Sequence, residues 1–98
     1  MKEDQYYIYI LTNKTSSVLY TGFTSDLLKR IDVHRQGYTD GFTKKYRVKS
    51  LVYYEIADSL DGALYCEKQT KGYSRKKKVS LIETNNPDWK DLFEELSD

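Results

Sequence analysis

The chain has little of several residue types that mark common protein classes. Its 98 residues include one cysteine, one proline and one histidine. An internal disulfide is therefore impossible, and one Cys with one His cannot supply a Cys/His zinc site. The longest apolar run, Tyr6–Leu11, is too short to span a bilayer. The first residues lack the apolar segment of a secretory signal, so a reduced, cytoplasmic location with no membrane contact is expected.

The residues that are abundant indicate a folded domain. Hydrophobic residues make up 39% of the chain and charged residues 32%, and ten residues are tyrosine. This composition can fill a core, and the length fits a single domain, residues 1–98. Tyrosine joins a flat apolar ring to a polar hydroxyl, so it suits a core and a binding cleft equally.

The net charge of +1 hides two segments of opposite sign. Residues 1–82 carry 15 Lys and Arg against 9 Asp and Glu, whereas residues 83–98 carry one Lys against 6 Asp and Glu. A basic body favours an anionic partner, most often nucleic acid, although the lysines could simply be solvated. The candidates for nucleic-acid contact are Lys44, Lys45, Lys71, Arg75, Lys76 and Lys77.

Side-chain periodicity predicts an α+β fold of the order β-β-α-β-α-α with a further C-terminal helix. The strands are expected at 6–11, 18–22 and 48–56, as a three-stranded antiparallel sheet flanked by helices. The helices are expected after a cap at Thr24 or Ser25, after Asp58 or Ser59, over 75–82 after Ser74, and over about 87–97 from Pro87. The core should then lie within about 5–82, with the acidic helix packed on it.

Two pairs of polar residues recur at helical spacing. Arg30 and His34 are four residues apart on the first predicted helix, and Glu67 and Lys71 are four apart on the second. Each pair therefore projects from one face of its helix, and Glu67 lies near the predicted buried edge. A surface Arg/His pair, or a Glu/Lys pair that only stabilises its helix, explains the same spacing, so both interpretations stay open.

The tyrosines of the predicted hairpin add a third group. Tyr7 and Tyr9 share one face of the first strand, and Tyr20 lies on the second strand just before Gly22. Cross-strand aromatic pairs can simply stabilise a hairpin. A phenol near an Arg, a His and a Glu nevertheless supplies the parts of phosphodiester hydrolysis, namely a proton acceptor, a cation for phosphoryl oxygens and a carboxylate for a metal.

These residues, in this order, resemble the GIY-YIG nuclease superfamily. The matching residues are Tyr7-Ile8-Tyr9, Tyr20-Thr21-Gly22, Arg30, His34 and Glu67. Tyr20 lies eleven positions after Tyr9, Arg30 lies ten positions after Tyr20, and His34 lies four positions after Arg30. The resemblance covers about residues 5–96. The stretch from Glu67 to Ile82 looks like the small stand-alone bacterial branch, which is similar to the N-terminal nuclease domain of the excinuclease C subunit.

The resemblance implies a divalent-metal-dependent endonuclease that hydrolyses DNA, in a structure-selective or non-specific way. It implies that Tyr9 activates the attacking water and that Tyr20 supports it or contacts the scissile phosphate. It implies further that Arg30 stabilises the transition state and that His34 assists proton transfer. Glu67 would be the single protein ligand of one Mg²⁺ or Mn²⁺ ion, which would otherwise be coordinated by water.

The sequence departs from the family pattern at three points. The first Gly of the family name is Tyr7 here, and the Ile of the second motif is Thr21. An asparagine near the C-terminus of many members has only Asn85 or Asn86 as candidates. Many members also gain DNA specificity from a fused module, and without one a protein partner becomes a candidate source of specificity.

Two other functions remain open at this point. The basic helices and exposed tyrosines would also serve a nucleic-acid-binding module with weak or lost catalysis. The acidic C-terminal segment, with Trp89 and Phe93, would alternatively serve a protein-interaction domain of the same fold.

Overall fold

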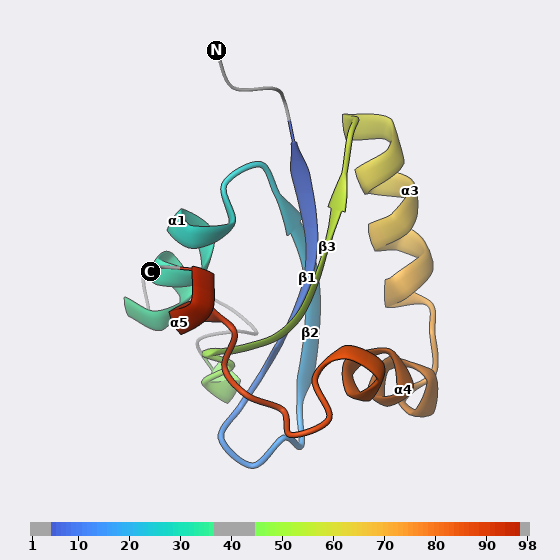
Figure 1. Ribbon diagram of the computed structural model, residues 1–98. Coiled ribbons are helices and arrows are strands. Elements are labelled where there is room, and N and C mark those ends of the chain that lie inside the picture. Colours follow the sequence, from blue (N-terminus) through green and yellow to red (C-terminus); the bar gives the residue numbers. More distant parts are fainter. Residues whose placement is uncertain (1–4, 37–44, 97–98) are drawn as a thin grey trace.

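The structure, a computed structural model, describes residues 5–36 and 45–96 (Figure 1). Its strands are β1 (Tyr6–Thr12), β2 (Leu19–Thr24) and β3 (Ser50–Ala57), and its helices are α1 (Leu27–Gln36), α3 (Leu60–Lys71), α4 (Arg75–Asn85) and α5 (Phe93–Leu96). The strands form one sheet in the order β2-β1-β3, and both pairings are antiparallel. The predicted α+β fold with a three-stranded antiparallel sheet is therefore confirmed.

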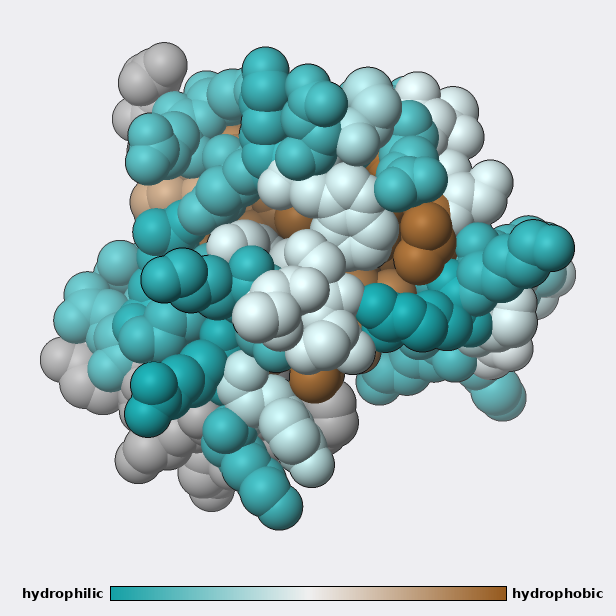
Figure 2. All heavy atoms as spheres, turned by 90° about the horizontal axis from the view of Figure 1, so that it is seen from below, coloured by the Kyte–Doolittle hydropathy of each residue, from teal (hydrophilic) through white to brown (hydrophobic). Residues whose placement is uncertain are grey.

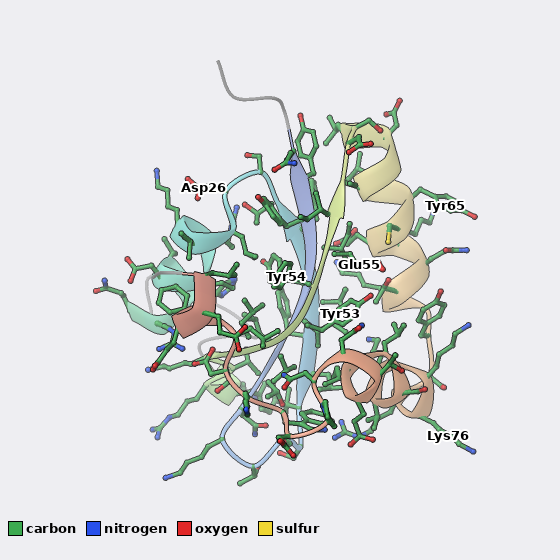
Figure 3. The ribbon with its side chains drawn as sticks, in the orientation of Figure 1. Asp26, Tyr53, Tyr54, Glu55, Tyr65 and Lys76 are labelled. Atoms are coloured by element: carbon green, nitrogen blue, oxygen red, sulfur yellow. The ribbon has the colours of Figure 1, made fainter. Side chains whose placement is uncertain are left out.

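The two faces of the sheet bury different clusters of apolar residues. One cluster contains Tyr9, Leu11, Leu27, Ile31, Val48 and Leu51, and the other contains Ile10, Val52, Tyr53 and Ile82. Successive strand residues point to opposite faces, so the neighbours Tyr53 and Tyr54 contribute to different clusters (Figure 3). Figure 1 shows α1 and α5 on one side of the sheet and α3 and α4 on the other.

The helices begin at residues whose side chains accept backbone hydrogen bonds. The hydroxyls of Ser59 and Ser74 accept the N–H three residues further on, as predicted for α3 and α4. The predicted cap of α1 is wrong, because Asp26 takes that role and not Thr24 or Ser25. Asp26 Oδ1 accepts the N–H three residues on at 3.2 Å, while the Thr24 hydroxyl accepts the N–H of Asp26 itself at 3.1 Å.

The long C-terminal helix predicted over 87–97 is wrong. Only Phe93–Leu96 are helical, and residue 97 lies outside the described residues. The side chain of Asn86 accepts the N–H of Lys90 at 3.0 Å and donates to its carbonyl oxygen at 2.9 Å, which closes a turn. Trp89 within this turn has a φ of 56°, a left-handed conformation that no right-handed helix contains.

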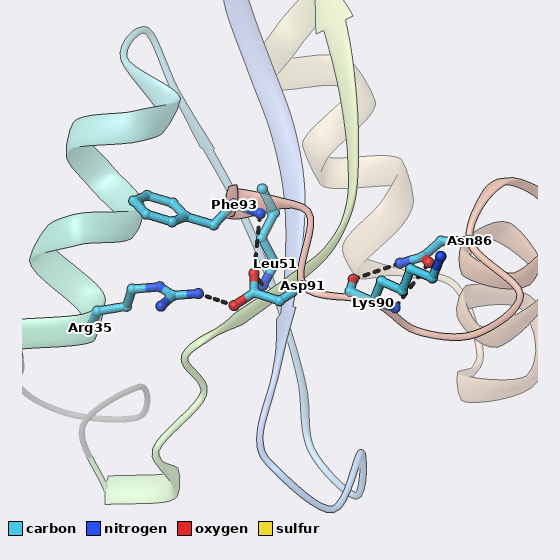
Figure 4. Close-up of polar contacts among 6 residues, drawn as sticks. All are labelled: Arg35, Leu51, Asn86, Lys90, Asp91 and Phe93. Atoms are coloured by element: carbon cyan, nitrogen blue, oxygen red, sulfur yellow. Dashed lines mark hydrogen bonds and ion pairs between the residues drawn. The ribbon is translucent and has the colours of Figure 1, made fainter. Parts of the chain in front are cut away.

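Residues 86–92, here called the C-terminal strap, run across the end of β3 to α1. Asp91 Oδ1 accepts the backbone N–H groups of Leu51 and Phe93, each at 3.1 Å, and Asp91 Oδ2 accepts a hydrogen bond from Arg35 (Figure 4). The Arg35 guanidinium also lies over the Phe93 ring, 4.5 Å from its centroid. The acidic segment is thus tied to the strand and helix that border the first apolar cluster.

Helix α3 packs on the sheet through a narrow face. Ala63 and Thr70 are buried, whereas Leu64 is 41% exposed, and Tyr65 is also exposed (Figure 3). One residue turns a helix by about 100°, so a face centred on Ala63 leaves Leu64 at its margin.

Hydrophilic residues cover most of the surface seen in Figure 2, and hydrophobic ones show mainly in its middle. Within residues 5–36 and 45–96, no helix has the length and apolar character that a bilayer crossing requires.

Candidate active site

Tyr9 lies at the centre of a cluster of rings from three elements. It stands on the central strand β1 and is 2% exposed, and its hydroxyl oxygen lies 3.4 Å from Nε2 of His34 on α1. His34 is also buried. The Tyr20 ring, on the edge strand β2, lies 6.4 Å from the Tyr9 ring and 5.7 Å from the His34 ring, centroid to centroid. The fold therefore brings together three of the predicted site residues.

Gly22 makes room for the Tyr9 ring. The two residues are directly opposite in the β1–β2 register. A Cβ atom added at Gly22 would lie 2.6 Å from the Tyr9 hydroxyl oxygen and 2.8 Å from Cζ, and 3.2 Å from Cε2 of Tyr20. Any larger residue would therefore displace Tyr9, so the glycine of the second motif fixes where the phenol lies.

The electrostatics of the cluster keep the phenol protonated and the imidazole neutral at pH 7. Burial raises the pKa of Tyr9 far above its ordinary value, and Tyr20 and Glu67 raise it further, while Arg30 opposes them. Burial and the charge of Arg30 lower the pKa of His34 below its ordinary 6.5. Because Arg30 and Glu67 both act on Tyr9, α1 and α3 each bring a charged residue near this phenol.

Glu67 offers a single carboxylate to a cation. Its side chain is 15% exposed and binds the Lys71 ammonium, with Nζ 2.8 Å from Oε2, so the predicted pair forms. Within the described parts of the chain, no group of three or more His, Cys, Asp or Glu side chains could hold a metal ion. Glu67 could therefore hold a divalent cation only as a single protein ligand, with water in the remaining positions.

Comparison with known proteins decides the family. Residues 5–80 match the family model of the GIY-YIG catalytic domain. The chain belongs to the GIY-YIG family. GIY-YIG domains are nuclease domains that generally use a divalent metal, which supports an endonuclease-type function here.

The relatives of this GIY-YIG chain are small proteins of similar length. A UPF0213 protein of Staphylococcus saprophyticus is 44% identical over 79 residues, which cover 81% of this chain and 95% of the relative. A UPF0213 protein of Syntrophus aciditrophicus is 42% identical over 80 residues, covering 81% and 91%. The solution NMR structure of a UPF0213 protein from Bacillus halodurans matches with a TM-score of 0.56 and 31% identity, covering 89% of this chain and 92% of that one. The predicted small stand-alone branch is therefore confirmed.

The two departures from the GIY-YIG motifs occupy packing positions. Tyr7 packs edge-on against Tyr54, with ring centroids 6.5 Å apart. Thr21 is 3% exposed, and its Oγ1 has no hydrogen-bond partner among the described residues. A buried hydroxyl without a partner marks a position that also suits the apolar isoleucine of the motif. Neither departure alters the ring cluster around Tyr9.

The predicted basic residues of α4 have different surroundings. Arg75 donates to two backbone carbonyl oxygens of residues 16–17, at 2.6 and 3.1 Å, so it ties α4 to the β1–β2 turn. Lys77 Nζ lies 4.1 Å from the centroid of the Tyr73 ring. Lys76 is exposed and extends away from the body (Figure 3). Both lysines remain candidates for phosphate contact, whereas part of Arg75 is engaged within the fold.

Two other basic residues differ from the predicted set: Lys78 was not among the predicted contacts, and Lys44 is not described by the structure. Lys78 is half-buried, and burial together with the charge of Lys71 lowers its pKa, so the two lysines lie close together. Its only sequence signal is its place at the end of the basic run 75–78. Lys45 is exposed, with Nζ 5.4 Å from the centroid of the Tyr46 ring, and Lys44 lies outside the described residues.

Asn86, one of the two candidates for the C-terminal asparagine of GIY-YIG proteins, serves the strap. Its side chain is engaged with Lys90 (Figure 4). It also donates through Nδ2 to the Val52 carbonyl oxygen at 3.1 Å. Asn85 is exposed at the end of α4. These contacts give Asn86 a structural role and use both N–H donors of its amide.

The aromatic residues proposed for a docking surface pack on the body. Trp89 packs against the second apolar cluster, and its Nε1 donates to Glu83 at 2.8 Å. Phe93 packs against the first cluster and lies beneath Arg35. Both side chains are half-buried, so they hold the strap in place and do not form a free apolar surface.

Proposed function

We propose that this GIY-YIG chain is a divalent-metal-dependent endonuclease that hydrolyses DNA phosphodiester bonds. The observation that carries this proposal is the Tyr9 hydroxyl at 3.4 Å from His34 Nε2, with the charges of Arg30 and Glu67 acting on the same phenol. These residue types are the ones that phosphodiester hydrolysis needs, and they come from β1, α1 and α3.

Tyr9 and His34 act together as the proton acceptor for the attacking water. The raised pKa of Tyr9 keeps the phenol protonated, so the phenol alone is a poor base at neutral pH. The lowered pKa of His34 keeps its imidazole neutral and able to accept a proton. As the water attacks phosphorus, its proton passes to the Tyr9 oxygen while the Tyr9 proton passes to His34 Nε2.

Arg30 and Tyr20 act on the phosphate. The Arg30 guanidinium places positive charge near Tyr9, where negative charge develops on the non-bridging oxygens during attack. Tyr20 lies against Tyr9 and His34 on the edge strand, where its hydroxyl supports the water or contacts the scissile phosphate.

Glu67 would hold the Mg²⁺ or Mn²⁺ ion, and a metal bound there supplies Lewis-acid stabilisation of the phosphate and leaving oxygen. Lys71, Lys76 and Lys77 provide positive charge for the DNA backbone on the α3 and α4 side of the sheet. Arg75 and Lys45 are further candidates for contact with the DNA backbone. Part of the Arg75 side chain is engaged by its hydrogen bonds to the β1–β2 turn.

The test is cleavage of a supercoiled plasmid and of a branched DNA with Mg²⁺ or Mn²⁺. The wild type is compared with Glu67→Gln and Arg30→Ala. Asp61→Asn, an exposed carboxylate on the same helix as Glu67, and Lys29→Ala, beside Arg30, are the matched controls. We expect metal-dependent cutting that falls by about 10²- to 10³-fold in the two site variants and stays at the wild-type rate in the controls.

Two results would contradict this proposal, the first by its mechanism and the second by its activity. One is cutting that survives chelation of the metal or that Glu67→Gln leaves unchanged. The other is salt-dependent DNA binding without any cutting on either substrate, which would favour the nucleic-acid-binding module.

A further inference from the structure

The ion pair of Glu67 places a cation on the carboxylate that we propose as the metal ligand. Lys71 Nζ lies 2.8 Å from Glu67 Oε2, and the lysine side chain is 54% exposed against 15% for the glutamate. A metal ion that binds Oε2 on the side occupied by the ammonium would have to displace Lys71.

The charges nearby do not favour a divalent cation in the absence of substrate. Arg30 and Glu67 both act on Tyr9, and Lys71 neutralises Glu67. No group of three or more ligating side chains in the described parts of the chain adds negative charge. A DNA phosphate brings the missing negative charge, and an ammonium released from Glu67 can bind that phosphate instead.

Lys71 is placed to make such a move. It is the last residue of α3, and Gly72 follows as the cap, so its long flexible side chain lies at the open end of a helix. Lys78 on α4 lies close enough for the two like charges to repel, which favours a phosphate between them. In the free protein the Lys71 side chain is thus half-exposed, and a phosphate can replace Glu67 as its partner.

We propose that Lys71 is a built-in counter-ion of Glu67 that couples metal binding to DNA binding. In the free protein the ammonium occupies the cation position. Metal and a DNA phosphate displace it together, and Lys71 then contacts the DNA backbone. This inference rests on the proposed function and adds to it that each ligand strengthens binding of the other by the same factor.

The first experiment measures Mn²⁺ binding without DNA, from the electron paramagnetic resonance signal of free Mn²⁺. The wild type is compared with Lys71→Met and with Lys68→Met, which removes an exposed lysine of the same helix with no ion pair in the described parts of the chain. We expect Lys71→Met to bind Mn²⁺ about threefold to tenfold more tightly than the wild type, as the loss of a partly exposed ion-pair competitor allows. Lys68→Met should bind as the wild type does, and melting curves of all three check the fold.

An Lys71→Met affinity equal to that of the wild type or of Lys68→Met would overturn the inference, and so would an absence of Mn²⁺ binding in all three proteins. Repeating the titration with a short DNA duplex in a Tyr9→Phe background, to slow cleavage, tests the coupling. The duplex should tighten Mn²⁺ binding more when Lys71 is present, and equal tightening in the Lys71→Met protein would contradict it.

The inference and the proposed function fail separately. If the wild type cuts DNA and Lys71→Met leaves the Mn²⁺ affinity unchanged, only the counter-ion role of Lys71 is contradicted. If Lys71→Met binds Mn²⁺ more tightly but the protein never cuts DNA, the nuclease proposal is contradicted and the counter-ion role of Lys71 is supported.

Discussion

The Tyr9 ring lies over Gly22 and leaves no space for a side chain at that position. An added Cβ would lie 2.6 Å from the Tyr9 hydroxyl oxygen, so Gly22→Ala must displace that oxygen and change its position relative to His34. We expect Gly22→Ala to lower the single-turnover cleavage rate by about 10²-fold, because a displacement of about 1 Å has that effect on reacting groups. Gly62→Ala is the control, since its added Cβ meets only the Ser59 hydroxyl oxygen, at 3.0 Å.

An unchanged cleavage rate in Gly22→Ala would show that the position of the Tyr9 hydroxyl does not matter to the reaction. DNA affinity, measured alongside, separates this from a general loss of fold, because the lysines proposed to bind phosphate lie on other elements.

His34 predicts how activity and stability depend on pH. Burial and Arg30 hold its pKa below 6.5, so the unfolded chain binds the proton more readily than the folded protein does. The free energy of unfolding should therefore fall as pH drops from 6.5 through the folded pKa. Cleavage should fall as pH drops through the folded pKa of His34, because a protonated imidazole cannot accept the Tyr9 proton.

Urea titrations and kcat/KM profiles between pH 5 and pH 8 check both expectations, with His34→Gln as the comparison. His34→Gln should lose this part of the pH dependence of stability. A His34→Gln protein that kept the wild-type profile in both measurements would assign the pH dependence to another group.

At the scale of elements, the sequence predicts what local chemistry determines. Ser59 and Ser74 cap their helices as expected, because an N-cap hydrogen bond joins residues three apart in the chain. The prediction of a long C-terminal helix is wrong because Asn86 bonds both to Lys90 and to the distant Val52. No sequence pattern displays that second contact.

The site shows the same division. The identities of Tyr9, Arg30, His34 and Glu67 could be chosen from the sequence, because their types carry the chemistry and their spacing resembles a family. Their mutual placement depends on the register of β1 with β2 and on the packing of two helices, which only the structure gives. Lys78 was missed because a lysine in a basic run carries no sign of which neighbour it approaches.

The C-terminal strap predicts a stability effect of its own. Asp91 accepts the N–H of Leu51, the N–H of Phe93 and a hydrogen bond from Arg35. Asp91→Ala leaves two N–H donors and a guanidinium without this partner, so we expect it to lower the free energy of unfolding by about 1–3 kcal/mol. Urea denaturation measures this, and Asp88→Ala, on an exposed residue of the same strap, should change little. Equal effects of the two substitutions would show that the strap does not depend on Asp91.

At the scale of the whole molecule, the acidic C-terminal segment and the basic helix α4 lie on opposite sides of the sheet. The acidic strap and α5 cover the side of α1, whereas the basic helix α4 lies beyond the other face of the sheet (Figure 1). We expect the lysines of α3 and α4 to neutralise DNA phosphates on their side of the sheet, while Arg30 of α1 acts on the scissile phosphate near Tyr9.

The salt dependence of DNA binding tests this placement of the phosphates. Each lysine that contacts a phosphate contributes about 0.9 to the slope of log K against log salt concentration for duplex DNA. The double variant Lys76→Ala, Lys77→Ala should therefore reduce the slope by about 1.8. Lys90→Ala, on the strap, should leave it unchanged, and the reverse pattern would place the DNA on the opposite side.

The most direct test of the account is the single-turnover cleavage rate of Tyr9→Phe with Mg²⁺ and saturating DNA. Phenylalanine keeps the buried ring against Gly22 and removes only the hydroxyl that lies 3.4 Å from His34 Nε2. We predict a rate about 10²- to 10⁴-fold below that of the wild type, with DNA affinity and the free energy of unfolding close to the wild-type values. A Tyr9→Phe protein that cuts DNA at the wild-type rate would contradict the central role of the Tyr9 hydroxyl.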